Sequence, residues 1–355
     1  MRIAQVSPLY ESVPPQAYGG TERVVSFLTE ELVRQGHDVT LFASGDSQTK
    51  ARLVPMAPHA LRLGGSEDAL AHHVLMADRV ARIGRQFDVV HFHIDYVHFP
   101  LSRRERYTHA TTLHGRLDIP DLQPLYDEFR EMPVVSISDA QRAPLPQANW
   151  QATVYHGLPV DLFHFEPEPR GYLAFLGRIS PEKRVDRAVE IARRTGMTLR
   201  VAAKVDDADR RYFETEIAPL FELPFVNYIG EISETEKQEF LGGATALLFP
   251  IDWREPFGLV MIEAMACGTP VVALRRGSVP EVVADGITGV VCDSVDQLPA
   301  AVHDARHIDP LTCREHVRDV FDVATMALRY EQIYRTSIIG RIAREVTTRQ
   351  LVPGV

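Results

Sequence analysis

Short apolar runs alternate with longer amphipathic segments along the chain, which is typical of parallel sheets covered by helices on both faces. In the first half, strands are expected at 2–8, 38–44, 88–93, 109–114, 133–138 and 152–157. Apolar residues recur at helical spacing over 21–36, where Gly36 ends the pattern, and over 67–86. These elements predict a first α/β domain.

The pattern pauses at 163–171, a proline-rich and acidic segment that we interpret as a linker. A second series follows, with strands expected at 172–177, 198–204, 226–230, 246–250 and 270–275, and helices near 181–195, 207–222, 234–242 and 257–267. We therefore predict an α/β protein of two doubly wound, Rossmann-like domains with a cleft between them, residues 1–168 and 169–321. A last helix at 322–345 is expected to pack back on the first domain.

Composition narrows the classes of function. The chain has 355 residues, more than one ordinary core, and its 38 Lys and Arg against 48 Asp and Glu give a formal net charge of −10. That balance argues against a nucleic-acid-coating protein, since phosphate contacts need clustered cations. The three cysteines show neither a metal-ligand spacing nor a disulfide framework. Without a signal-peptide pattern or an apolar stretch of about 18 residues, we expect a cytoplasmic protein with no transmembrane segment.

Ligands of doubly wound sheets bind just beyond the carboxyl ends of the strands, so the segments that follow the strands are informative. After the first strand, Gly19 and Gly20 can adopt positive φ and allow a ligand to approach the backbone, and Thr21 is a candidate helix cap. The alternative is an ordinary tight turn. The segment matches neither a dinucleotide fingerprint nor a P-loop.

Arg178 and Lys183 follow the first strand of the second domain. Ser180 is a candidate cap and Pro181 a candidate first helical residue. Because a helix start normally attracts acids, two cations there indicate that an anion is expected. The alternative is that both are solvated or paired with neighbouring acids.

Two acids, Glu255 and Glu263, flank the apolar segment PFGLVMI. The backbone amides near Phe257, Gly258 and Leu259 are expected to lie at a helix start, where they can bind a phosphate or a sugar oxygen. A carboxylate in apolar surroundings needs a partner, and the two O–H groups of a vicinal diol suit one. The alternative is a solvated acid followed by an acid on a helix face.

Nearly the whole chain resembles the retaining glycosyltransferases of family 4 (group 1), which have the GT-B fold. The segments that carry the resemblance are, in order, GGTERVVSFLTEELVRQGHDVTLFAS, DVVHFH, SISDAQR, VYHGLPVDLF, LGRISPEKR, PFGLVMIEAMACGTPVVAL and GSVPEVVADGITGVVC. The resemblance implies that the first domain lies on the acceptor side and that the second binds a nucleotide sugar.

The resemblance also implies roles for residues of the donor site. Glu255 would contact the donor sugar and Glu263 the ribose. Arg178 and Lys183 would neutralise the leaving diphosphate, and Gly20 would let backbone amides approach the distal phosphate.

In the first domain, His114 would lie beside the transferred sugar, and Ser138 and Arg142 match a motif on the acceptor side. The chain departs from the family pattern in two places. Arg184 stands where the family usually has glycine, and His156 precedes Gly157 where the family commonly has asparagine.

The function expected from this resemblance is transfer of a hexose from a UDP-, ADP- or GDP-sugar to a hydroxyl of a small-molecule, glycan or lipid-linked acceptor, with His114, Glu255, Arg178 and Lys183 as catalytic candidates. A nucleotide-sugar epimerase or hydrolase and a non-catalytic sensor are the alternatives. No cofactor and no metal are expected. The acids at 206–209 and the histidines at 91, 93 and 98 are alternative candidates for metal ligands, but a helix start is the stronger interpretation of the acids and the histidines lack an evident third ligand. The basic segment 102–107 is a candidate for a peripheral contact with an anionic membrane surface, and the alternative is a solvated face.

Overall fold

The computed structural model describes residues 1–16, 19–105 and 107–351. The chain forms two compact units: residues 1–137, 142–157 and 323–355 make the first, and residues 138–141 and 158–322 the second. The boundary expected at 168 thus differs from that of the structure, where the long segment of the second unit begins at Leu158. Residues 163–171 are not a free linker, because Phe163 is buried and the amide of Glu166 donates to the carbonyl of Cys267.

The first unit is built on a parallel seven-stranded sheet in the order β3-β2-β1-β4-β5-β6-β7. Its strands are β1 (Arg2–Val6), β2 (Asp38–Ser44), β3 (Arg52–Ala57), β4 (Val89–Phe92), β5 (His109–Thr112), β6 (Pro133–Ser136) and β7 (Asn149–Thr153). The sequence pattern missed β3 and placed β7 a few residues too late. The order reverses between β1 and β4, which makes this the switch point of the sheet.

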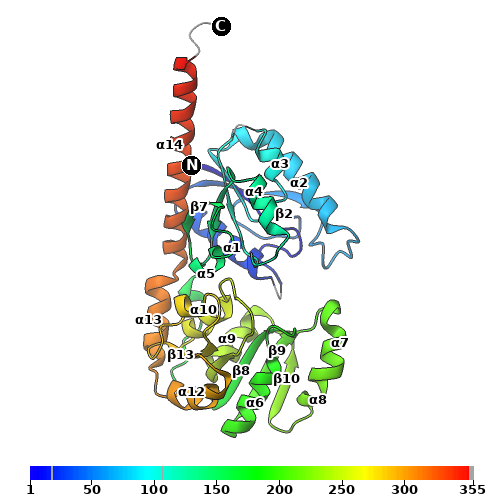
Figure 1. Ribbon diagram of the computed structural model, residues 1–355, viewed down its shortest axis with the longest axis vertical. Helices are drawn as coiled ribbons and strands as arrows, with labels where there is room; N and C mark the ends of the chain where they lie inside the picture. The colour runs from blue at the N-terminus through cyan, green and yellow to red at the C-terminus, as the bar shows by residue number, and fades with distance from the viewer. Residues whose placement is uncertain (17–18, 106, 352–355) are drawn as a thin grey trace. The chain divides into compact units, whose positions relative to one another are not determined.

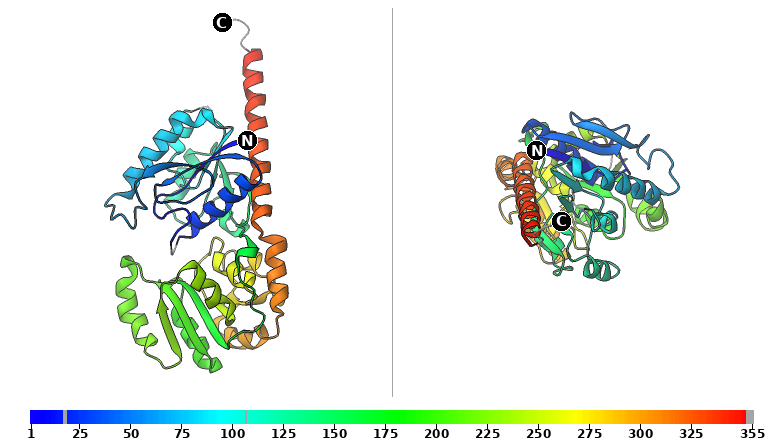
Figure 2. Two further views of the ribbon diagram at one scale, coloured as in Figure 1. Left: turned by 180° about the vertical axis from the view of Figure 1, so that it is seen from behind. Right: turned by 90° about the horizontal axis from the view of Figure 1, so that it is seen from above.

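The helices of the first unit cover this sheet, as Figure 1 shows. They are α1 (Gly20–Arg34), α2 (Ala69–Ile83), α3 (Phe99–Ser102), α4 (Leu122–Glu128) and the long α14 (Val323–Leu351), with a 3₁₀ turn at Gly84–Gln86. Although α14 ends the chain, it lies against α1 and β5 (Figure 2) and buries Tyr330 and Tyr334 in this unit.

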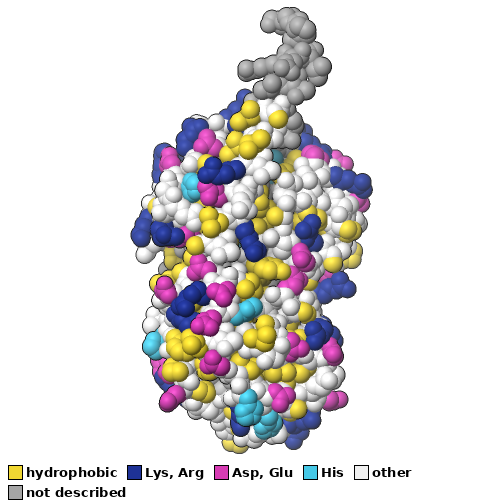
Figure 3. All heavy atoms as spheres, turned by 90° about the vertical axis from the view of Figure 1, so that its left-hand side faces the viewer, with side chains coloured by type: hydrophobic (Ala, Val, Ile, Leu, Met, Phe, Trp, Pro, Cys, Tyr) yellow, Lys and Arg dark blue, Asp and Glu magenta, His cyan; other side chains and the backbone are white. Residues whose placement is uncertain are grey.

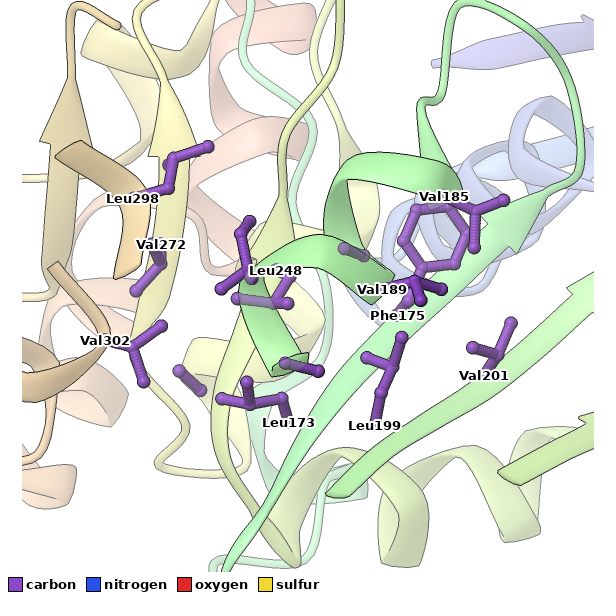
Figure 4. Packing of buried hydrophobic residues seen from close by; sticks show 14 of the residues in the cluster. Leu173, Phe175, Val185, Val189, Leu199, Val201, Leu248, Val272, Leu298 and Val302 are labelled. Atoms are coloured by element: carbon purple, nitrogen blue, oxygen red, sulfur yellow. The ribbon is translucent and has the colours of Figure 1, made fainter. Parts of the chain in front are cut away.

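The second unit repeats the arrangement with a parallel six-stranded sheet in the order β10-β9-β8-β11-β12-β13. Its strands are β8 (Tyr172–Arg178), β9 (Thr198–Lys204), β10 (Val226–Gly230), β11 (Ala244–Phe249), β12 (Val271–Leu274) and β13 (Gly289–Cys292). In the core, Val185 and Val189 of a covering helix pack over Phe175 and Leu199 of the sheet (Figure 4). The switch point here lies between β8 and β11.

The helices of the second unit are α5 (Asp139–Arg142, which ends at the boundary), α6 (Val185–Thr195), α7 (Arg210–Tyr212), α8 (Ala218–Phe221), α9 (Glu234–Gly242), α10 (Leu259–Ala266), α11 (Val279–Val282), α12 (Leu298–Ala305) and α13 (Pro310–Val320). Short turns at Val160–Leu162, Asp207–Asp209 and Val295–Gln297 and a π-helical stretch at Phe213–Ile217 complete it. The predicted helix start at Ser180 and Pro181 was wrong, because α6 begins at Val185.

The two ends of the long segment 158–322 of the second unit are close together. Leu158 forms an isolated bridge with Asp322, and its amide donates to the carbonyl of Phe321 at 2.9 Å. Apart from residues 138–141, the second unit is therefore one inserted segment, 158–322, and α14 follows it directly at Val323.

The surface carries charges of both signs. Basic and acidic side chains are interspersed on the face in Figure 3, in keeping with the composition. Among the described residues, no helix is both long and apolar enough to cross a bilayer.

Candidate functional site

The switch point of the second sheet brings together the two segments that the sequence singled out. β8 and β11 are parallel neighbours, so their carboxyl ends meet at the same edge. Arg178 ends β8 and is followed by the loop with Lys183, while the loop after β11 carries Glu255. The topology thus explains why residues more than seventy positions apart in the chain lie side by side.

Glu255 is a buried carboxylate with two donors on one oxygen. Its Oε2 accepts from Lys183 Nζ at 2.6 Å and from Trp253 Nε1 at 3.0 Å. The Lys183 ammonium also lies 4.8 Å from the centre of the Trp253 ring, within cation–π range. The alternative of a solvated acid is therefore wrong for Glu255. Trp253 itself was missed, although its place in the loop WREPFG was a usable signal.

Glu263 is a second buried carboxylate held by a lysine. It lies on α10, and its Oε1 accepts from Lys237 Nζ of α9 at 2.6 Å. The same ammonium lies 2.9 Å from Glu234 Oε2. Lys237 was missed because no spacing rule links a residue of one helix to its partner on another.

The start of α10 differs in detail from the prediction. Gly258 is the N-cap in the left-handed region, with φ of 80°, so the first helical residue is Leu259. Phe257 precedes the helix and is buried against Phe321, with ring centres 5.9 Å apart. Gly277 packs directly on the backbone of Glu255, where an added Cβ would lie 2.3 Å from the Glu255 carbonyl oxygen. A glycine is thus needed there to hold the Glu255 loop.

Arg178 lies in a cluster of mixed charge at the ends of β8 and β9. Its guanidinium donates to Glu182 at 3.0 Å and lies 3.5 Å from Asp206, which also pairs with Lys204 at 3.1 Å. Asp206 belongs to the acidic segment weighed as a metal ligand, and here it balances cations. Across the part of the chain that the structure describes, no group of three or more metal-ligating residues is found.

Arg184, which replaces the usual family glycine, adopts the backbone that favours glycine. Its φ is 55° and its ψ 50°, a left-handed conformation that is costly for a residue with a Cβ. Its side chain pairs with Asp186 at 2.8 Å and with Asp252 at 3.1 Å. These ion pairs explain how the loop retains the conformation without glycine. They engage the guanidinium with carboxylates rather than leaving it as a further phosphate ligand.

In the first unit, Gly19 and Gly20 lie at the start of α1, but not with the positive φ that was expected. Gly19 is extended at φ of 172°, and α1 begins at Gly20 without a side-chain cap from Thr21. The structural reason for glycine at 19 is instead close packing, since an added Cβ would lie 2.7 Å from Pro15 Cβ.

His114 follows β5 and lies in a cluster of imidazole rings. Its Nε2 is 2.9 Å from His93 Nδ1, and its ring stacks on that of His156 with centres 5.2 Å apart. Among the described residues, its buried Nδ1 has no hydrogen-bond partner. Burial lowers the pKa of His114 to about 3, so the ring is neutral near pH 7. A neutral ring suits orienting a hydroxyl better than acting as an acid.

The histidines that were weighed as metal ligands are engaged in hydrogen bonds. Both ring nitrogens of His98 face hydroxyls, those of Ser102 at 2.7 Å and Thr111 at 2.8 Å. Both nitrogens of His91 also face hydroxyls, and those of His93 face Gln5 and His114.

Ser138 and Arg142 fall on different units. Ser138 Oγ accepts the amide of Gln141 at 3.0 Å and so caps the short α5. The next amides, of residues 139 and 140, donate to the carboxylate of Glu281 at 2.7 and 2.8 Å. Arg142 lies over the Trp150 ring in the first unit. Ser138 and Arg142 thus lie at the two ends of the short α5.

The basic segment 102–107 is partly neutralised. Arg103 pairs with Glu128 and Glu131, and residue 106 lies outside the described residues. These pairs favour the reading of this loop as a solvated face.

Comparison with protein families identifies the chain. Residues 163–309 match the model described as "Glycosyl transferases group 1", and residues 18–145 match "Glycosyltransferase Family 4". The chain belongs to this family of glycosyltransferases. It is therefore an enzyme, and the two parallel-sheet units are those of the GT-B fold.

Curated relatives of this glycosyltransferase carry different names. It is 27% identical to a glycogen synthase of Mycobacterium tuberculosis, over 94% of each chain. It is 26% identical to a D-inositol 3-phosphate glycosyltransferase of Mycolicibacterium smegmatis, over 78% of this chain and 76% of the relative.

Solved structures similar to the glycosyltransferase share its fold. AviGT4, a glycosyltransferase involved in avilamycin A biosynthesis, has a TM-score of 0.74 at 24% identity, covering 96% of this chain and 98% of its own. Anabaena HepE in complex with UDP-glucose has a TM-score of 0.68 at 16% identity, covering 95% and 99%. Starch synthase IV of Arabidopsis thaliana bound to ADP and acarbose has a TM-score of 0.70 at 15% identity, covering 95% and 99%.

Proposed function

We propose that this glycosyltransferase moves a hexose from a nucleotide-diphosphate sugar to a hydroxyl acceptor, with retention of anomeric configuration and without a metal ion. The observation that carries the proposal is the buried Glu255 carboxylate, held by Lys183 and Trp253 at the switch point of the second sheet. A carboxylate poised beside a cation suits a ligand that has both hydroxyls and phosphates.

Lys183 and Glu255 can exchange partners when such a ligand binds. A diphosphate carries more charge than one carboxylate and competes for the Lys183 ammonium. Glu255 is then released to accept hydrogen bonds from sugar hydroxyls, and Trp253 Nε1 continues to hold one carboxylate oxygen. The sugar is thereby fixed next to the phosphate that leaves.

Departure of the diphosphate needs positive charge where negative charge develops. Lys183 and Arg178 supply it at the end of β8, and the amides at the start of α10 supply oriented dipoles. In the family mechanism, the leaving phosphate helps to take the acceptor proton on the same face of the sugar, so a protein base is not required. His114 then orients the sugar.

Glu263 is proposed to hold the ribose. It is a buried carboxylate one helical turn inside α10, and Lys237 holds its orientation through a hydrogen bond of 2.6 Å. Among the similar structures, one is a complex with UDP-glucose and another is bound to ADP, so the nucleotide stays open among UDP, ADP and GDP. The acceptor is a small-molecule, glycan or lipid-linked hydroxyl, and a peripheral membrane contact is not required.

The experiment that tests the function measures nucleotide release from a panel of UDP-, ADP- and GDP-hexoses without acceptor, with and without EDTA. Slow release from one donor, insensitive to EDTA, is the expected result. Release abolished by EDTA would contradict metal independence. Tight binding of one donor without release, in the presence of candidate acceptors as well, would favour the sensor alternative, and conversion of the sugar without its release would favour an epimerase.

A further inference from the structure

A continuous hydrogen-bonded chain of buried side chains leads to His114 within the first unit. His114 Nε2 is 2.9 Å from His93 Nδ1, and His93 Nε2 is 2.8 Å from Gln5 Oε1. The amide nitrogen of Gln5 then donates to the hydroxyl of Tyr334 at 3.3 Å. Gln5, His93 and Tyr334 are buried, so water does not compete for these contacts.

The chain continues from Tyr334 to the other tyrosine of α14. The Tyr334 hydroxyl is 2.7 Å from His91 Nδ1, and His91 Nε2 is 2.7 Å from Thr112 Oγ1. Thr112 Oγ1 is in turn 2.9 Å from the Tyr330 hydroxyl. Three strands and the last helix thus join in one network, which we call the histidine relay: Gln5, His91, His93, Thr112, His114, Tyr330 and Tyr334.

The polarity of the Gln5 amide decides which ring nitrogens carry protons. Burial lowers the pKa of His114 to about 3 and that of His93 well below its ordinary value, so each ring carries one proton near neutrality. The amide oxygen of Gln5 can only accept, so His93 is protonated at Nε2 and its Nδ1 is an acceptor. His114 must then be protonated at Nε2, which leaves its Nδ1 as a lone pair.

If every hydrogen bond of the relay ran in the opposite direction, the one N–H or O–H left without an acceptor would lie at a less favourable place. The opposite direction requires a flipped Gln5 amide and gives His114 a buried N–H at Nδ1, fixed in direction and without a partner in the described structure. In the first arrangement, the O–H left without an acceptor belongs instead to Thr112 or Tyr330, whose hydroxyls can rotate. An orphaned buried N–H is among the rarer features of folded proteins, so the first arrangement is favoured.

We propose that Gln5 and His93 are positioning residues that fix the tautomer of His114, so that its Nδ1 accepts a hydrogen bond from a hydroxyl of the substrate. The tautomer follows from the relay alone. The assignment of the hydroxyl to a sugar substrate rests on the proposed function. A ring locked in this form accepts from an O–H and rejects a group that offers only lone pairs.

The direct test is ¹⁵N NMR of the imidazole rings in the full-length, histidine-labelled protein, with His93 and His114 assigned by single substitutions. The expected result is protonation at Nε2 in both rings near pH 7. Protonation of His114 at Nδ1, or rapid exchange between its two tautomers, would overturn the proposal. The tautomers themselves are read in the unsubstituted protein, and the substitutions serve only to assign its signals.

Gln5→Leu breaks the relay next to His93, and Thr111→Val is the matched control. Thr111 is equally buried on β5, but it bonds His98 in a network that does not reach His114. We expect Gln5→Leu to release the His114 tautomer and to lower kcat for nucleotide release about tenfold or more, with the Kd for the free nucleoside diphosphate unchanged. Thr111→Val should change neither quantity. A His114 tautomer that survives Gln5→Leu would overturn the proposal.

The two possible failures are distinguishable. If the tautomers are as expected but no nucleotide sugar is turned over, the relay is upheld and the proposed function fails. If nucleotide is released normally and His114 carries its proton at Nδ1, the function stands and this inference fails.

Discussion

Replacing Glu255 by glutamine separates sugar binding from phosphate binding. The carboxylate is held by Lys183 at 2.6 Å and by Trp253 at 3.0 Å, and glutamine preserves its shape while removing its charge. Two opposite effects follow. The sugar loses a charged acceptor, and the Lys183 ammonium loses a competitor for the diphosphate.

The magnitude of each effect, on transfer and on nucleotide binding, follows from the contacts of Glu255. A hydrogen bond to a charged group contributes about 1.5–3 kcal/mol, so transfer should fall about tenfold to a hundredfold. The released ammonium is largely buried, with 16% of its side chain exposed. We therefore expect free nucleoside diphosphate to bind as tightly as before or more tightly, by up to about 1–2 kcal/mol, or roughly five- to thirtyfold.

Isothermal titration with UDP, ADP and GDP measures the second effect, and nucleotide release from the matching sugar measures the first. Glu263→Gln is the matched control, because it too removes one charge from a buried pair with a lysine. Glu263→Gln should weaken the binding of the free nucleotide itself. Equal losses of nucleotide affinity in both variants would refute the division of roles, and weaker binding in Glu255→Gln alone would refute the exchange of partners.

Three further predictions concern stability and are measured by urea unfolding. Lys237→Met strands the buried Glu263 carboxylate and should cost about 3–5 kcal/mol, whereas adding Glu263→Leu should recover much of it; no recovery would mean that the charge pair is not the cause. Arg184→Gly and Arg184→Ala both remove the ion pairs, but only glycine relieves the positive φ, so the glycine variant should be more stable by about 1 kcal/mol; equal stabilities would argue against strain. Burial lowers the pKa of His98 well below 6.5, so the unfolded chain binds its proton first, and stability present above pH 6.5 is lost as the pH falls. His98→Gln should therefore reduce the pH slope below 6.5 by about 1.4 kcal/mol per unit, and an unchanged slope would contradict the neutral buried ring.

Much of the fold could be predicted because buried parallel strands have a strong local signal. The run at 198–204 coincides with β9, and 234–242 with α9, where Ser233 and Glu236 form a capping box. The start of α6 could not be predicted in this way. Ser180 and Pro181 have the right residue types for a helix start, but Arg184 takes a left-handed backbone that ion pairs to distant residues stabilise.

The residues of the candidate site that could be predicted are those in the loops directly after strands. Lys183 and Glu255 were found because parallel topology places strand ends together. Lys237 was missed because its partner lies on another helix. The spacing of His91 and His93 indicated a metal site more readily than a relay, since Tyr334, a partner of His91, lies 243 residues away along the chain.

The bridge between Leu158 and Asp322 bears on the order in which the molecule is made. A ribosome synthesises the entire second unit before α14, which carries Tyr330 and Tyr334 of the first. We expect the inserted unit to fold during translation while the first waits for its last helix. A chain that ends at residue 322 should then show protease protection of residues 158–322 only. Equal protection of the first seven strands would show that the amino-terminal half completes its fold without the tail.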